Sequence, residues 1–304
     1  MRPQDAAALV ALAGLWGGSY LLMRIAVGAF GPVALIETRV AVAAMLLLPM
    51  LIWQGARIGL RQLAHVAVIG LGNTAIPFLL IAYAIQTLSV GLASILNATS
   101  PLFGAIVAWA WLRDPLDRWR VAGLCVGFAG VVVLLGDRAS LAGGADPSVV
   151  ALSIAATLGA ALMYGIGASY ARRFLQGAGS LPVAAYSQSV AALALAPVGW
   201  AYWPAEPPGA VPWAAVVALG AGCTGLAYLL YFRLIANIGP VRAISVTFLI
   251  PAFGMFWGRV VLGEPVTLRM LTGAAVILCG TALATGLLAP GRRATARRLG
   301  ARPR

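Results

Sequence analysis

Long apolar stretches alternate with short polar breaks along the whole of this 304-residue chain. A helix needs roughly 20 apolar residues to span about 30 Å of hydrocarbon. The pattern therefore predicts an all-α integral membrane protein of ten transmembrane helices, with little length left for a soluble domain. The approximate limits of these helices are residues 6–26, 32–53, 63–85, 91–112, 119–136, 148–171, 181–202, 211–233, 241–262 and 268–288.

An internal repeat emerges when each residue is compared with the residue 150 positions later. Between residues 1–136 and 151–286, 32 of 136 positions are identical without a gap, whereas roughly one in ten is expected by chance from such a composition. The repeat predicts a first five-helix unit over residues 1–147 and a second over 148–290, followed by a basic tail at 291–304. Matched residues include Gly17 with Gly167, Tyr20 with Tyr170, Pro101 with Pro251, and Gly123 with Gly273.

Five helices per unit is an odd number, so the second unit must enter the bilayer from the opposite side. Two units in opposite orientations can pack around a two-fold axis in the membrane plane, with a binding site at their interface. Such an assembly can open to either side of the membrane. The expected fold is thus two inverted five-helix repeats, and the expected mechanism is alternating access.

Composition supports the membrane assignment and removes several mechanisms. Hydrophobic residues make up 62% of the chain and charged residues 10%, with a mean hydropathy of +0.94, whereas soluble domains carry roughly a quarter charged residues. The sequence contains no lysine. A nucleotide-binding P-loop and a Schiff-base cofactor both require one. ATP hydrolysis of that kind and a retinal or pyridoxal phosphate cofactor are therefore not expected.

No arrangement of residues indicates an enzyme. The three cysteines and the single histidine, His65, show no metal-ligand spacing, and no HExxH or GxSxG motif occurs. We expect no metal, no cofactor and no catalytic residues.

Arginine side chains orient the chain, because short cytoplasmic loops are enriched in basic residues. We expect the protein to lie in the inner membrane of a bacterial cell with both termini in the cytoplasm. In this orientation most loop arginines lie on the cytoplasmic side. The net charge of +13 then indicates anionic lipid headgroups as partners, and not nucleic acid. The inner set is Arg2, Arg57, Arg61, Arg113, Arg118, Arg120, Arg172, Arg173, Arg242 and the tail arginines.

Charges are scarce inside the predicted helices, and each one is costly in hydrocarbon. Glu37 and Arg39 lie within the second helix, where the repeat places Ser187 and Ser189. On a functional reading, Arg39 attracts a substrate carboxylate, and Glu37 binds and releases a coupling proton. On a structural reading, Arg39 caps carbonyls of a neighbouring helix and Glu37 neutralises a cation such as Arg24 near the outer face.

Aromatic and amide side chains form the remaining candidates for a binding cavity. Aromatic rings with a polar edge offer an apolar face and a hydrogen-bond donor to a small amphipathic solute. The alternatives are interfacial belt positions, as expected for Tyr83 and Tyr170, and helix packing for most amides. The predicted substrate-binding residues are Trp16, Tyr20, Arg39, Asn73, Phe78, Asn97, Tyr164 and Tyr228.

Two prolines lie at matched positions inside the fourth and ninth helices. Pro101 and Pro251 each remove a backbone hydrogen bond and weaken the helix locally. Because the repeat relates them, we predict a symmetric hinge; a fixed bend is the alternative.

Several short segments, taken in order, resemble the EamA family of the drug/metabolite transporter superfamily. They are Leu15-Trp16-Gly17-Gly18-Ser19, Arg39 in an Ala/Leu-rich helix, Leu262-Gly263-Glu264-Pro265, and the Gly273 and Gly280 pair with its counterpart Gly123 and Gly130. The first repeat departs from the pattern at Leu112-Arg113-Asp114-Pro115 but keeps an acidic residue.

The resemblance implies a basket-like helical fold with a central cavity formed by helices 1, 3, 4, 6, 8 and 9. It also implies export or exchange of amino acids or related small metabolites. A passive channel or a lipid scramblase is the alternative from another functional class.

Overall fold

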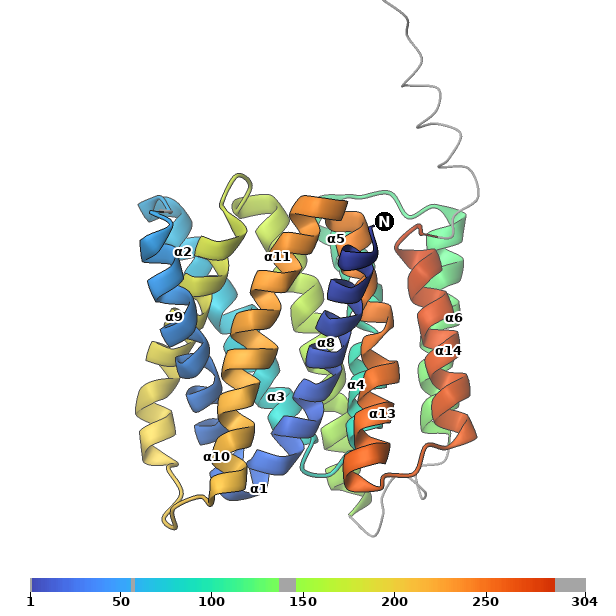
Figure 1. The fold of residues 1–304 in the computed structure, drawn as a ribbon. Helices are drawn as coiled ribbons and strands as arrows, with labels where there is room; N and C mark the ends of the chain where they lie inside the picture. Colours follow the sequence, from blue (N-terminus) through green and yellow to red (C-terminus); the bar gives the residue numbers. More distant parts are fainter. Residues whose placement is uncertain (1, 56–57, 137–145, 288–304) are drawn as a thin grey trace, which may run out of the picture.

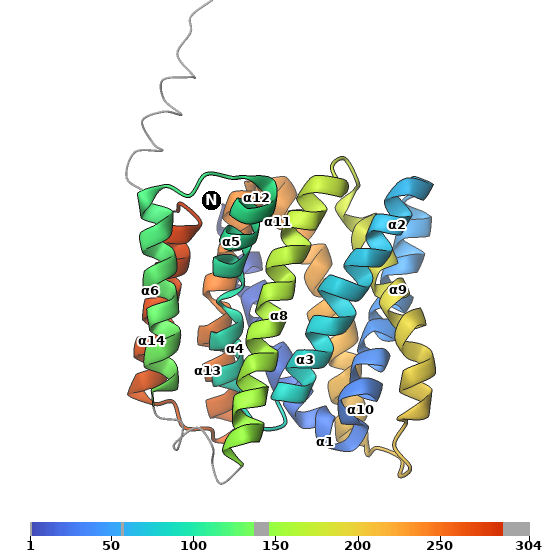
Figure 2. The ribbon, with the colours of Figure 1, turned by 180° about the vertical axis from the view of Figure 1, so that it is seen from behind.

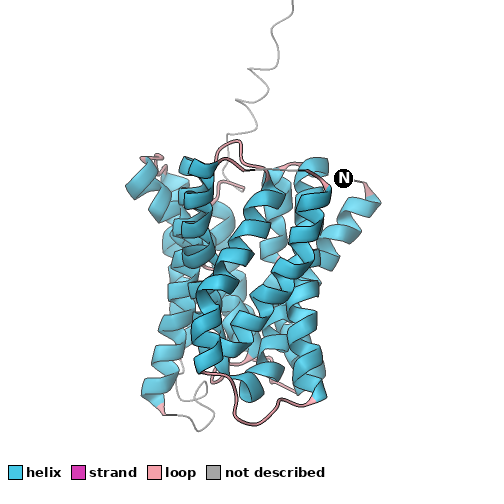
Figure 3. Cartoon of the chain, turned by 90° about the vertical axis from the view of Figure 1, so that its left-hand side faces the viewer, coloured by secondary structure: helices cyan, strands magenta, loops and turns pink. Residues whose placement is uncertain are grey.

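The structure, a computed structural model, describes residues 2–55, 58–136 and 146–287. Within these ranges every element is helical and no strand is present (Figure 3). Seven helical stretches are long and apolar enough to cross a membrane, and two shorter apolar helices follow them. The chain is a multi-pass membrane protein. The predicted tail at 291–304 lies outside the described residues.

The helices lie side by side as a bundle (Figure 1). They are α1 (Pro3–Trp53), α2 (Leu60–Ile69), η1 (Gly70–Ala75), α3 (Ile76–Ala84), α4 (Val90–Asn97), α5 (Ser100–Leu112), α6 (Arg118–Leu135), α8 (Pro147–Phe174), α9 (Ser180–Ala201), α10 (Ala210–Val217), η2 (Ala218–Leu226), α11 (Ala227–Ile238), α12 (Pro240–Ala243), η3 (Ile244–Phe248), α13 (Ile250–Leu262) and α14 (Leu268–Ala284).

The long helix α1 is two arms joined at a break. Gly31 has φ +68° and ψ 164°, a backbone conformation that residues with a Cβ avoid. Pro32 follows it and starts the second arm. The first arm descends from the chain start and the second returns to the same end (Figure 1). The arms, residues 3–30 and 32–53, match the predicted helices at 6–26 and 32–53, and the described chain begins and ends at one end of the bundle.

Two stretches of π-helix occupy matching positions in the two halves. Residues 70–75 of η1 correspond through the 150-residue shift to 220–225, which lie inside η2. Each π-helix continues directly from one α-helix into the next, α2 to α3 and α10 to α11. Such wide turns in α-helices are rare and often lie at functional sites.

Two helices are interrupted at matching positions as well. The chain is not α-helical at Ala98 and Thr99, between α4 and α5. At the equivalent place in the second half, the 3₁₀-helix η3 precedes α13. Pro101 and Pro251 lie in the first turns of α5 and α13. A proline is tolerated there because the first N–H groups of a helix have no intrahelical acceptor.

Helices α6 and α14 pack side by side in both views (Figures 1 and 2), and glycine permits their contact. A Cβ on Gly280 would strike the backbone of Gly127, and a Cβ on Gly130 would lie 2.7 Å from the backbone nitrogen of Ile277. The shift of 150 converts one of these contacts into the other. Exchanged contacts of this kind are what a two-fold relationship between two units produces.

The π-helices make a second pair of close contacts between the halves. A Cβ on Gly70 in η1 would lie 2.7 Å from the carbonyl oxygen of Ser187 in α9. A Cβ on Gly220 in η2 would lie 2.7 Å from the carbonyl oxygen of Arg39 in α1. Each half therefore rests its π-helix against the other half at backbone distance.

The outer surface exposes many large apolar side chains. Exposed fractions reach 73% for Met45, 86% for Trp53, 75% for Leu193 and 85% for Trp200. Water would disfavour so large an apolar surface, and lipid chains accept it.

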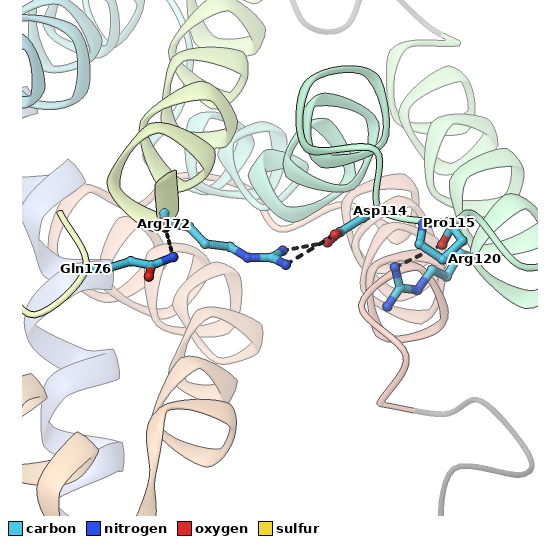
Figure 4. Close-up of polar contacts among 5 residues, drawn as sticks. All are labelled: Asp114, Pro115, Arg120, Arg172 and Gln176. Atoms are coloured by element: carbon cyan, nitrogen blue, oxygen red, sulfur yellow. Dashed lines mark hydrogen bonds and ion pairs between the residues drawn. The ribbon is translucent and has the colours of Figure 1, made fainter. Parts of the chain in front are cut away.

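Carboxylates tie the halves together at both ends of the bundle. At the end where the chain begins, Arg172 of α8 donates two hydrogen bonds of 2.5 and 3.2 Å to the Asp114 carboxylate after α5 (Figure 4). At the other end, Glu264 accepts the N–H of Val90 at the start of α4, at 2.9 and 3.1 Å. Asp114 and Glu264 are repeat mates that bind different partners.

We predict that Gly280→Ala lowers the melting temperature of the purified protein, because overpacking a tight contact costs about 1–3 kcal/mol. Gly28→Ala is the control. Gly28 is exposed in α1 with no atom near the position of its Cβ, and alanine favours helix by up to about 1 kcal/mol. Equal melting temperatures for the two variants would contradict the close approach of α6 and α14.

A second prediction concerns the Asp114–Arg172 ion pair. Hydrogen bonds from Arg172 hold the pKa of the Asp114 carboxyl below its usual value. A lowered folded-state pKa stabilises the fold above the unfolded pKa of about 4, and the effect is lost as pH falls through the folded value. The wild-type protein should melt slightly above Asp114→Asn from pH 8 down to about pH 5, and the difference should shrink as the pH falls below about 4. A difference that disappears by pH 6 would rule out this linkage.

Candidate functional site

A cavity of about 350 Å³ lies between the two halves. Its volume suits a small metabolite. All six helices expected to form it contribute, and the second arm of α1 adds Arg39. The lining residues are Trp16, Ser19, Tyr20, Met23, Arg39, Asn73, Phe78, Ile81, Ser94, Asn97, Ala98, Ser100, Pro101, Gly104, Tyr164, Gly165, Ala168, Cys223, Thr224, Tyr228, Ile244, Thr247 and Ile250.

The eight residues predicted to bind substrate all line this one cavity, although they come from six separate predicted helices. Pro101 lines it too, whereas Pro251 and Glu37 are not part of the lining. The structure thus brings the predicted set together. Substrate binding by these residues and hinge motion at the prolines stay predictions.

Arg39 is the charged residue of the cavity wall, and it is 5% exposed. Its Nε donates to the Thr224 hydroxyl at 3.0 Å, and one terminal nitrogen lies 3.7 Å from the Met23 sulfur. The guanidinium carbon lies 3.6 Å from the centre of the Phe78 ring, which places the charge over a π face. These contacts fix the plane of the guanidinium at the cavity wall.

No carboxylate pairs with Arg39 among the residues that the structure describes. The titratable side chains that interact with its charge are Tyr164, Cys223, Tyr228 and Tyr20. The structural reading that Arg39 caps backbone carbonyls is wrong, because its acceptors are a hydroxyl and a sulfur. A guanidinium has five N–H donors, so donors remain for an anionic group in the cavity.

Glu37 lies on another side of α1 from Arg39, as a spacing of two residues in a helix requires. Its side chain packs against α9, where a Cβ on Gly199 would lie 2.8 Å from Glu37 Cγ. The reading that Glu37 neutralises Arg24 is also wrong. Arg24 donates to the carbonyl oxygens of Ile85 and Gln86 at 2.5 and 2.6 Å, and so completes the end of α3.

The interrupted helices end at the cavity. Asn97 and Ala98 close α4, and Ser100 and Pro101 open α5. Ile250 brings the start of α13 to the same wall. No side chain caps the N-terminus of either α5 or α13. The starts of α5 and α13 and the end of α4 therefore lie at the same cavity as Arg39.

Several lining residues are repeat mates with different chemistry. Asn73 corresponds to Cys223, Phe78 to Tyr228, and Asn97 to Thr247. Cys223 and Thr224 were not predicted as site residues. The 150-residue shift applied to Asn73 and Thr74 would have found them, since the repeat places equivalent positions around a common cavity.

A sequence profile described as the EamA-like transporter family matches the chain twice, at residues 6–136 and 151–286. The two matches cover both halves that line the cavity.

Curated relatives carry transporter names. The "Uncharacterized transporter YvbV" of Bacillus subtilis is 25% identical over 293 residues, covering 93% of this chain and 92% of that protein. An "Uncharacterized transporter" of Archaeoglobus fulgidus is 25% identical over 281 residues, covering 87% and 92%. The "Uncharacterized inner membrane transporter YedA" of Escherichia coli is 32% identical over 130 residues, 42% of each chain.

A crystal structure matches the fold with a TM-score of 0.65 and 23% sequence identity, covering 99% of this chain and all of that one. At that identity the likeness concerns the fold alone.

Proposed function

This chain belongs to the EamA-like transporter family, and we propose that it is a secondary transporter that exports or exchanges amino acids or related small metabolites by alternating access. The observation that carries the proposal is the central cavity, in which Arg39 has no carboxylate partner among the described residues.

The proposed architecture is ten transmembrane helices in two inverted five-helix units, residues 1–147 and 148–290. The break at Gly31 makes α1 two crossings, and the exchanged contacts of α6 with α14 support a two-fold relationship. Units related in this way can rock about the cavity that they share and expose it to either side.

The proposed substrate carries a carboxylate and an apolar body. A carboxylate placed against Arg39 gains charge-assisted hydrogen bonds. Trp16, Tyr20, Phe78, Tyr164 and Tyr228 enclose the apolar part, and Asn73 and Asn97 offer amides to the remaining polar groups.

We place the protein in the inner membrane of a bacterium with both termini in the cytoplasm. Among the residues that the structure describes, several arginines lie at the end of the bundle where the chain begins (Figure 1). They are Arg61, Arg113, Arg118, Arg172 and Arg173. Basic residues on the cytoplasmic side match anionic lipid headgroups.

Uptake of radiolabelled amino acids and related metabolites into proteoliposomes tests the proposal. We expect saturable uptake and counterflow, in which unlabelled solute inside drives entry of labelled solute. A channel gives neither saturation nor counterflow. A scramblase gives lipid exchange without solute uptake. Absence of saturable flux across a broad panel of carboxylate metabolites would reject the transporter proposal.

Arg39→Ala should reduce transport of carboxylate solutes at least tenfold, because loss of a hydrogen bond to a charged group costs about 1.5–3 kcal/mol. Arg39→Lys, which keeps the charge but loses the planar fork, should fall between. A solute analogue without the carboxylate should be transported equally by all three proteins. Melting temperature and expression are measured alongside, and a variant that fails only because it unfolds would assign Arg39 a structural role.

If Glu37 couples transport to protons, Glu37→Gln should remove the dependence of transport on an imposed pH gradient. The reason is that the amide cannot exchange a proton over the working range. The readout is initial uptake with and without the gradient. An unchanged gradient dependence would end the coupling role, and the packing of Glu37 against Gly199 would then be its function.

A further inference from the structure

A second cavity, of about 550 Å³, lies at the end of the bundle where the chain begins, between the last turns of α5 and α8. It is separate from the central cavity and shares no lining residue with it. Three of its lining residues are cations. The lining consists of Trp111, Leu112, Arg113, Arg172, Arg173 and Gln176.

We call this second cavity, lined by the six residues above, the socket. Its positive charge is not balanced within the described chain. Asp114 neutralises Arg172, and the Gln176 amide donates to the Arg172 carbonyl oxygen at 2.9 Å (Figure 4). Neither Arg113 nor Arg173 has a carboxylate partner among the residues described. Two positive charges therefore remain beside the ion pair.

The backbone at Arg113 is unusual. Arg113 ends α5 with φ 57° and is the non-glycine residue with positive φ in the described chain. Its repeat mate, Gly263, ends α13 with φ 68°. Glycine adopts this conformation without strain, whereas a residue with a Cβ does so at a cost. Glycine would therefore end this helix with less backbone strain than arginine. The presence of arginine here indicates a role for its side chain.

Aromatic rings order the third arginine. The Arg173 guanidinium lies 5.8 Å from the Trp111 ring and 5.4 Å from the Phe174 ring. Trp111, which contacts the Tyr170 and Phe174 rings of α8, is itself 36% exposed. The cations of the socket thus border an apolar surface that faces lipid.

The other end of the bundle has no such cations at the equivalent positions. The repeat mates of Arg113, Arg172 and Arg173 are Gly263, Leu22 and Met23. The equivalent helix ends in the other repeat therefore pack without these charges, so packing alone does not require them.

We propose that this socket binds the phosphate headgroup of an anionic glycerophospholipid. The phosphate oxygens accept hydrogen bonds from Arg113 and Arg173, and the acyl chains lie along the exposed edge of the Trp111 ring. Charge complementarity selects an anion, and the adjoining apolar face selects a lipid over a soluble phosphate. The site does not depend on what the central cavity transports.

The test uses delipidated, purified protein and native mass spectrometry to measure binding of the first phosphatidylglycerol, with phosphatidylcholine as the neutral comparison. We expect wild-type protein to prefer phosphatidylglycerol. Each arginine near an anionic surface changes affinity by about fivefold. Arg113→Gly and Arg173→Gln should each weaken phosphatidylglycerol binding by about that factor, and together by roughly twenty-five-fold. Phosphatidylcholine binding should not change.

Arg113→Gly is informative because glycine suits the backbone there, so the variant should melt no lower than wild type. Arg61→Gln on α2 is the matched control: it removes an exposed arginine near the same end, outside the socket. An Arg61→Gln effect as large as that of Arg173→Gln would show diffuse surface charge and overturn the proposal. Unchanged binding in the double variant, or equal competition by inorganic phosphate, would also overturn it.

Discussion

Glycine contacts at backbone distance hold the two halves of this protein together, and the cavity depends on them. Within a lipid bilayer the hydrophobic effect does not drive helices against one another, so close packing must do it. Gly127 and Gly280 bring α6 to α14, and Gly70 and Gly220 seat the π-helices on α9 and α1. Because these contacts cross between the halves, each half shapes the wall that the other completes. The cavity lies between two units whose distance is set by backbone contacts at glycine residues.

The sequence alone predicted the all-helical membrane fold and the grouping of the cavity residues. Hydropathy is a local property that lipid enforces along each helix, and polar residues in apolar helices are few enough to stand out. Partner choice was not predictable in the same way. Glu37 packs on Gly199, and Arg24 binds the carbonyl oxygens of Ile85 and Gln86. Which helix lies opposite a given face depends on how the units cross, and the sequence of one helix does not contain that information.

Equivalent carboxylates in the two repeats bind different partners. Glu264 accepts the N–H of Val90, but the repeat mate of Val90 is Pro240, which has no N–H to offer. Asp114, the mate of Glu264, binds Arg172 instead. One end of the bundle is therefore joined through a helix N-terminus inside the fold, and the other through a pair of exposed side chains. The two ends consequently respond differently to salt, since exposed ion pairs are screened by dissolved ions.

The paired π-helices set the direction in which the residues beyond them point. A π-turn holds more residues than an α-turn, so every residue after it is rotated about the helix axis relative to its place in an unbroken α-helix. The π-helices η1 and η2 lie at equivalent positions in the two halves. Loss of the wide turn from either half would turn the following residues around the helix axis and carry Phe78 or Tyr228 away from the centre. Each half thus depends on its own wide turn to supply an aromatic ring to the cavity wall.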